Sequence, residues 1–163
     1  MGHDISAYIK TKSNPNPNWE TGKEVAYFRI GAFNKLRQRL FYGIIPGSDV
    51  ANAGVSGDGS SLDFTRDDIS NSIEACKYFM EDETALQETL LSFQHPAEET
   101  AKQFRSVLEK IFASMPNAKV VDTDTTIDDI REDIADVWKF CDNILSAYDV
   151  CGDDAQGIQI YFG

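Results

Sequence analysis

The sequence predicts an α+β fold in which a small antiparallel sheet of about three strands packs on three to four longer helices. Alternating apolar residues near both ends of the chain indicate half-buried strands, because successive strand side chains point to opposite faces. Apolar residues spaced by three and four dominate the second half, and this spacing places them on one helix face. A length of 163 residues, with 42% hydrophobic, suits one domain over residues 1–163.

An N-terminal hairpin forms two strands of the predicted sheet. In residues 2–10, Ile5, Ala7 and Ile9 share one face, as is typical of a half-buried strand. Residues 11–22 include several prolines, which lack the N–H needed by a sheet ladder, so they form a surface loop. Residues 23–31 form the second strand, and we expect the two strands to pair.

A short helix is predicted over about residues 34–43, with Asn34 as its N-cap. Its apolar stripe consists of Leu36, Leu40 and Phe41. Its basic side chains are expected to lie mostly away from that stripe: Lys35, Arg37 and Arg39.

Residues 45–64 form the longest irregular segment of the sequence, and such loops in compact domains tend to be functional or mobile. The segment is glycine-rich and precedes a helix N-terminus, where anions bind well. It lacks the Gly-Lys-Ser/Thr ending of a P-loop, and its aspartates would repel phosphate. The competing interpretation is a flexible or tightly turned surface loop. The candidate ligand-binding residues are Ser56, Gly57, Asp58 and Gly59 in this segment, together with His3 near the N-terminus.

Four further helices are predicted after this segment. Thr65 and Asp68 form a capping box at the start of the first. Residues 84–92 are assigned to a short helix and about 96–114 to a longer one, whereas residues 118–121 are too short to assign. The stripe of the helix that starts at Thr65 repeats at helical spacing: Ile69, Ile73, Cys76 and Met80.

The last helix, over about residues 126–149, has the clearest pattern of the chain. Residues 122–128 mimic the start of a calcium loop, but Ile127 stands where that loop requires glycine. We interpret them instead as a helix cap formed by Thr125 and Asp128. Residues 157–163 then alternate as a third strand, which we expect to join the hairpin. The helix stripe consists of Ile127, Ile130, Ile134, Val137, Cys141, Ile144 and Tyr148.

Acidic residues outnumber basic ones by 27 to 15, which gives a net charge of -12. The charge is uneven, because residues 1–65 carry a net +1 and residues 66–163 a net −13. Such a chain lacks the basic face that nucleic acids and anionic membranes attract. It fits docking of a basic protein partner, although acidity that serves only solubility is the competing interpretation. The candidate docking residues on the last helix are Asp128, Asp129, Glu132 and Asp136.

Sequence motifs for catalysis are absent. No Gly-x-Ser-x-Gly nucleophile motif occurs, and His3 and Asp4 would point to opposite faces of a strand, which disfavours a shared metal site. The sequence does not place His3, Asp58 and His95 relative to one another. Carboxylates on solvated helix faces are poor acids or bases at neutral pH. We therefore expect a chain that is not an enzyme and that holds no cofactor.

The cysteines and the N-terminal pattern bear on the compartment. Cys76, Cys141 and Cys151 are odd in number and lack metal-ligand spacing, as expected of free thiols in a reducing environment. The first residues alternate like a strand rather than following the basic-then-apolar order of a signal peptide. No apolar run reaches the roughly 18 residues of a membrane span. We expect a cytoplasmic protein that does not enter the membrane.

Two functional hypotheses follow from these patterns. The leading one is a non-enzymatic, acidic binding or regulatory protein that acts on a protein partner, as inhibitor and immunity proteins do. The alternative is a protein that binds a small molecule or metal at the 45–64 segment, with or without enzymatic activity.

Overall fold

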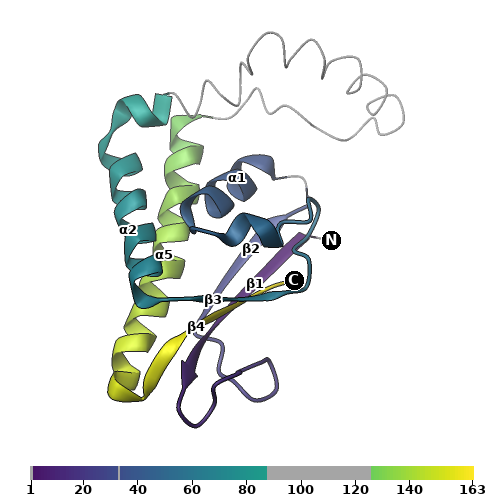
Figure 1. Ribbon diagram of the computed structural model, residues 1–163. Helices are drawn as coiled ribbons and strands as arrows, with labels where there is room; N and C mark the ends of the chain where they lie inside the picture. The colour runs from purple at the N-terminus through teal and green to yellow at the C-terminus, as the bar shows by residue number, and fades with distance from the viewer. Residues whose placement is uncertain (1, 33, 88–125) are drawn as a thin grey trace.

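The computed structural model describes residues 2–32, 34–87 and 126–163, and its α+β architecture confirms the predicted fold class (Figure 1). Residues 83–87 are helical, while the rest of the predicted 84–92 helix, the 96–114 helix and residues 118–121 lie outside the described residues. The described elements are β1 (Gly2–Thr11), β2 (Ala26–Gly31), α1 (Lys35–Ile44), β3 (Ser61–Phe64), α2 (Arg66–Glu81), α5 (Ile127–Cys151) and β4 (Ala155–Phe162), with short 3-10 helices at Ser48–Ala51 and Gly152–Asp154.

The sheet has four antiparallel strands in the order β2-β1-β4-β3. The predicted hairpin and the return of the C-terminal strand are both confirmed, and β4 pairs with β1 from Ile5↔Phe162 to Thr11↔Ala155. The additional strand, β3, corrects the prediction that residues 45–64 are irregular throughout. It escaped prediction because only Leu62 and Phe64 alternate in its four residues, too few to establish a period of two.

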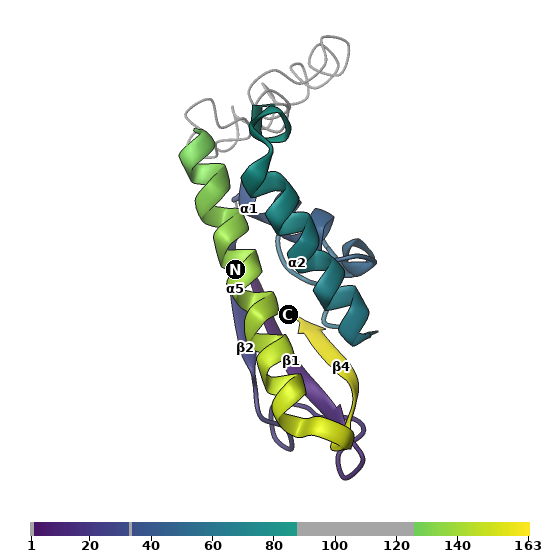
Figure 2. The ribbon, with the colours of Figure 1, turned by 90° about the vertical axis from the view of Figure 1, so that its left-hand side faces the viewer.

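The inner face of the sheet holds the core. In β2, buried and exposed positions alternate strictly. On the outer face, Tyr27 and Tyr161 remain 49% and 42% exposed, whereas Tyr8 is covered and only 5% exposed. Helix α5 lies on the inner face, α1 contacts α5, and α2 packs alongside α5 (Figure 2). The side chains that α5 buries are Ile130, Ile134, Val137, Phe140, Cys141 and Ile144.

Helix starts follow the capping chemistry of the sequence. Asn34 caps α1 by accepting from the Arg37 backbone N at 3.1 Å, and Thr65 caps α2 in a capping box, as predicted. In α5 the capping box is formed by Thr126 and its partner Asp129, one residue later than predicted. Both adjacent threonines have an aspartate three residues on, so the local pattern alone cannot choose between the two.

The end of α5 is also set locally. The helix continues to Cys151, two residues beyond the predicted boundary, and stops at Gly152, whose φ of 56° suits glycine. The chain then turns into β4.

Among the helices of the described residues, none is long and apolar enough to cross a membrane.

The packing of α5 on the sheet predicts a large cost for truncating its buried face. Ile144→Ala should lower the free energy of unfolding by about 2–5 kcal/mol, since Ile144 is fully buried and a cavity would remain. Its exposed neighbour offers a matched control, and Asn143→Ala should change stability by less than about 0.5 kcal/mol. Urea unfolding of both variants measures the difference, and equal losses would contradict this placement of α5.

Candidate functional site

The predicted site residue His3 is fully buried on the inner face of β1. Its Nδ1 lies 2.8 Å from the hydroxyl of Tyr42 in α1, and its Nε2 lies 3.0 Å from the carbonyl oxygen of Gly54. A carbonyl only accepts, so Nε2 carries the hydrogen of the neutral ring and Tyr42 donates to Nδ1. His3 therefore joins β1 to α1 and to residues 52–60, which we call the glycine-rich loop.

The electrostatics of this pair favour two neutral groups. Burial lowers the pKa of His3 below its ordinary value of 6.5, and the positive charge of Lys35 lowers it further; the hydrogen bond to Gly54 and the charge of Asp4 act in the opposite direction. Burial raises the pKa of Tyr42 to about 12, with a further contribution from the negative charge of Asp58. Because Tyr42 occupies the lone pair of Nδ1, His3 is poorly placed to take a proton from a substrate.

The backbone amides of the glycine-rich loop are engaged within the chain. Gly57 N donates to Gly163 O at 2.9 Å, Gly59 N donates to Phe162 O at 2.8 Å, and Asp58 N donates to Ala51 O at 2.9 Å. These are three of the amides that an anion bound in the loop would need. The loop instead uses the amides of Gly57 and Gly59 to dock on the end of β4, and the amide of Asp58 to bond to Ala51.

Glycine at position 57 is required by this docking. A Cβ built there would lie 2.5 Å from the Phe162 carbonyl oxygen, closer than real Cβ atoms approach backbone. The other predicted residues of the loop also have local partners: Ser56 Oγ donates to Gly57 O at 2.9 Å, and Asp58 accepts from the backbone N of Ser60 at 2.9 Å. The structure thus brings His3 to the loop at Gly54 and gives each of these contacts a role in holding the loop.

The described residues offer no cluster of three or more His, Cys, Asp or Glu side chains suited to hold a metal ion. Asp4 points to the outer face of the sheet, where it accepts hydrogen bonds from Tyr27 and Arg29, while His3 points inward. The two therefore lie on opposite faces, as the strand pattern predicts. His95 lies outside the described residues.

The four predicted docking residues on α5 fall into two classes. Asp129 accepts from the Thr126 backbone N at 2.9 Å as part of the capping box, and Asp136 accepts from Arg37 at 2.6 Å. The side chain of Asp128 is 93% exposed, with Arg131 at 3.7 Å. Glu132 is exposed and makes no hydrogen bond or ion pair in the part of the chain that the structure describes. Of the four, Asp128 and Glu132 are thus the carboxylates that neither cap a helix through a hydrogen bond nor pair with Arg37.

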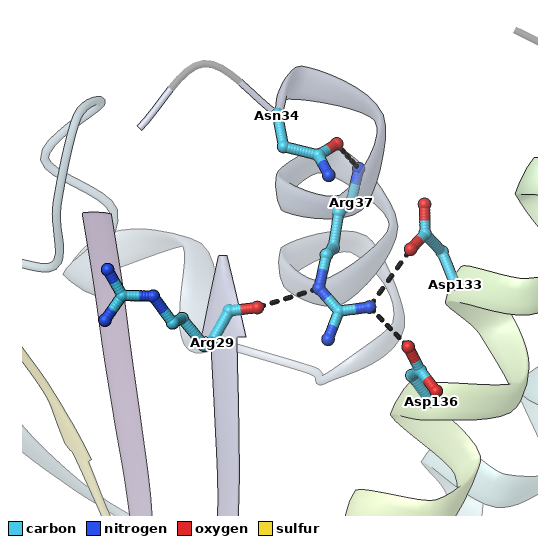
Figure 3. A network of polar contacts seen from close by, with 5 residues as sticks. All are labelled: Arg29, Asn34, Arg37, Asp133 and Asp136. Carbon is cyan, nitrogen blue, oxygen red and sulfur yellow. Dashed lines mark hydrogen bonds and ion pairs between the residues drawn. The ribbon is translucent and has the colours of Figure 1, made fainter. Parts of the chain in front are cut away.

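Arg37 is the centre of a polar network that links three elements (Figure 3). Its Nε donates to the carbonyl oxygen of Arg29 in β2 at 2.8 Å. One of its terminal nitrogens reaches both Asp133, at 3.0 Å, and Asp136 on α5, and its guanidinium lies 4.0 Å from the centroid of the Phe28 ring. The guanidinium is therefore held against the sheet and α5. The sequence placed Arg37 away from the apolar stripe of α1 but did not predict these contacts.

Burial shapes the titration of this network. Burial raises the pKa of Asp133, while the hydrogen bond and charge of Arg37 act to lower it. The carboxylate thus depends on Arg37 for its stability in the charged form. Sequence patterns did not reveal this contact, because the two residues are 96 positions apart and neither belongs to a recognisable motif.

Tyr42 and Gln38 were also missed by the sequence analysis. Both lie beside the predicted stripe of α1 and are buried, and Gln38 Nε2 donates to the side-chain oxygen of Asn52 at 2.8 Å. The only available signal was their spacing of four, which places them on one side of the helix.

Comparison of the chain with protein-family models, curated proteins and solved structures found no significant match.

The Arg37 network predicts a stability loss that depends on pH. Arg37→Met should destabilise the fold by on the order of 3 kcal/mol at pH 7, because Asp133 would remain mostly buried without its partner. The unpaired Asp133 would then have a folded-state pKa raised further above its unfolded value. A buried carboxyl group with a raised pKa lowers the free energy of unfolding at high pH, where it must be charged. The loss caused by Arg37→Met should therefore shrink as the pH falls through that raised pKa.

An exposed ion pair offers the matched control. Arg66 and Asp149 pair at 3.0 Å with side chains 43% and 58% exposed, so Arg66→Met should cost less than about 1 kcal/mol. Urea unfolding at pH 7 and pH 5 compares the two variants. Equal losses, or a loss for Arg37→Met that does not change with pH, would show that Asp133 does not depend on Arg37.

Proposed function

We propose that the chain is a non-enzymatic binding or regulatory protein that engages a basic protein partner through its acidic helices, in the way that inhibitor and immunity proteins meet their targets. The observation that carries this proposal is the charge of two neighbouring helices. Together α2 and α5 contain eleven acidic and four basic residues, a net charge of −7. The two helices run side by side in Figure 2, so their charges add over one region of the molecule.

Internal contacts account for only part of this charge. Asp68 and Asp129 cap helices, while Asp133, Asp136 and Asp149 face arginines. Glu132 and Asp142 are exposed and have no ion pair or hydrogen bond in the described residues, and Asp128 is almost fully exposed. Helix stability alone therefore does not explain why Glu132 and Asp142 are acidic, whereas Asp128 lies in the first turn of α5, where a carboxylate also stabilises the helix.

An exposed carboxylate surface acts mainly on the encounter with a partner. Complementary charge speeds association and disfavours partners of like charge, and the effect weakens with salt because the screening length is about 8 Å at physiological ionic strength. A basic patch on the partner is thus the chemistry that this surface fits. The proposal implies binding that is strongest at low salt.

The alternative, a small-molecule or metal site at residues 45–64, has less support. The ring nitrogens of His3 and three amides of the glycine-rich loop already have partners within the chain.

The proposed compartment is the reducing cytoplasm. It is supported by three free cysteines, of which Cys76 and Cys141 are buried, and burial raises the pKa of Cys76 to about 12.

The test uses a captured partner and charge reversal. Immobilised chain should retain a basic protein from a lysate of its source organism at low salt and release it at high salt. With that protein purified, Asp128→Lys combined with Glu132→Lys should weaken binding by about tenfold or more, mainly through a slower association rate. Surface plasmon resonance over a salt series measures both the rates and the salt dependence.

A control with the same change in net charge separates a docking surface from a general charge effect. Glu20→Lys combined with Asp49→Lys alters two exposed acidic residues outside α2 and α5, and it should change binding far less. If no protein is retained at low salt, or if both double variants weaken binding equally, the acidic helices are not the docking surface.

A further inference from the structure

The buried His3 is held by contacts that depend on its protonation state. β1 carries the ring, α1 supplies the hydroxyl of Tyr42, and the glycine-rich loop supplies the carbonyl of Gly54. The same turn of the loop is tied to α1 a second time, because the side-chain oxygen of Asn52 accepts from both Gln38 Nε2 and Gly54 N. The neutral ring fits this arrangement with one donor and one acceptor.

A second proton on the ring does not fit. With Nδ1 protonated, two hydrogens would meet at the Tyr42 contact, so the hydroxyl would have to turn and lose the acceptor that it has in the neutral pair. The charge would also be buried, with Ile30 as the cross-strand neighbour on β2. Lys35 on α1 opposes that charge and Asp4 on β1 favours it, while the charge of Asp58 in the loop acts on Tyr42.

We propose that His3 is an acid-sensitive latch for the glycine-rich loop: when Nδ1 takes a proton, the loop lifts from β1 and α1 and water reaches the ring, while the sheet and α5 stay folded. The loop is the element that yields because much of it is already exposed, including Asn52, Val55 and Asp58. β1 and α1, in contrast, contribute fully buried side chains such as Ile5 and Phe41 to the core.

The direction of the pH dependence follows from the burial of the ring. The pKa of His3 is lowered in the closed loop, so the closed loop binds fewer protons than the open one. The advantage of closure is fully present above the ordinary pKa of 6.5 and is lost as the pH falls through the lowered value. Opening returns the ring to water and raises the pKa again. This behaviour is independent of the acidic helices and of the proposed partner.

Two amides report directly on the latch. Gly57 N and Gly59 N are hydrogen-bonded to Gly163 and Phe162 only while the loop is docked. In the full chain, their protection against hydrogen exchange, corrected for the intrinsic pH dependence of exchange, should be constant from pH 7.5 to about 6.5 and should then fall by up to about tenfold per pH unit as the pH is lowered to 5. The amides of Val137 and Phe140 in α5 should keep their protection. Loop protection that is constant with pH, or that is lost together with α5, would overturn the proposal.

Three variants assign the effect to His3. His3→Gln keeps an acceptor for Tyr42 and a donor for Gly54 but takes no proton, so the loop should stay protected across this pH range. Tyr42→Phe removes the hydrogen bond that stabilises the neutral ring, and the loss of protection should move to higher pH. His95→Gln alters the other histidine of the chain and should behave like wild type.

The variants also separate a latch from a purely structural histidine. A purely structural role for Tyr42 would lower the protection of the loop amides equally at every pH. The latch instead requires a shift in the midpoint, which is the pH at which half of the pH-dependent protection is lost. If His3→Gln does not fold, the midpoint of Tyr42→Phe decides alone. A wild-type pH dependence in His3→Gln, or an unmoved midpoint in Tyr42→Phe, overturns the latch.

Discussion

The pairing of β1 with β4 is the constraint on which the other contacts depend. It joins the first and last strands of the chain at the centre of the sheet, in a register that aligns Ile5 with Phe162 and Ile9 with Ile158. β2 and β3 each add to one side of this pair, and α5 lies on its inner face before the chain turns into β4. The glycine-rich loop docks on the end of β4, and His3 is buried where α1 and this loop contact β1. Slippage of this register by one residue would turn every one of these side chains to the wrong face.

Local patterns in the sequence predicted the elements well but not the contacts between them. The alternation in β1 and β4, the N-cap at Asn34 and the stripe of α5 all depend on neighbours within a few residues. The contacts of His3 with Tyr42 and of Arg37 with Asp133 join positions 39 and 96 residues apart, and no local period encodes them. β3 lies between these cases. Its four residues become a strand because β4 offers an open edge, so tertiary pairing overrides a weak local signal.

Charge is organised differently on the two layers of the molecule. On the outer face of the sheet, charges are compensated between strands: Asp4 on β1 pairs with Arg29 on the neighbouring β2, and Lys10 on β1 reaches across β4 to Asp63 on β3. Among the helix carboxylates, Asp133 and Asp136 meet Arg37 and Asp149 meets Arg66, whereas Glu132 and Asp142 do not meet a cation in the described residues. Helices α2 and α5 therefore keep acidic side chains without a cationic partner in the described residues, and their combined net charge is −7.

The contact between Arg37 and the Arg29 carbonyl has a consequence for self-association. β2 is an edge strand, and unpaired carbonyls on an edge strand form a template on which another chain can add a strand. In this molecule α1 takes two carbonyls of β2: Arg37 Nε bonds to that of Arg29, and the backbone N of Asn34 bonds to that of Gly31 at 3.0 Å. The opposite edge, β3, is only four residues long and carries Asp63. The residue that anchors α1 to α5 thus also protects the sheet against edge-to-edge aggregation.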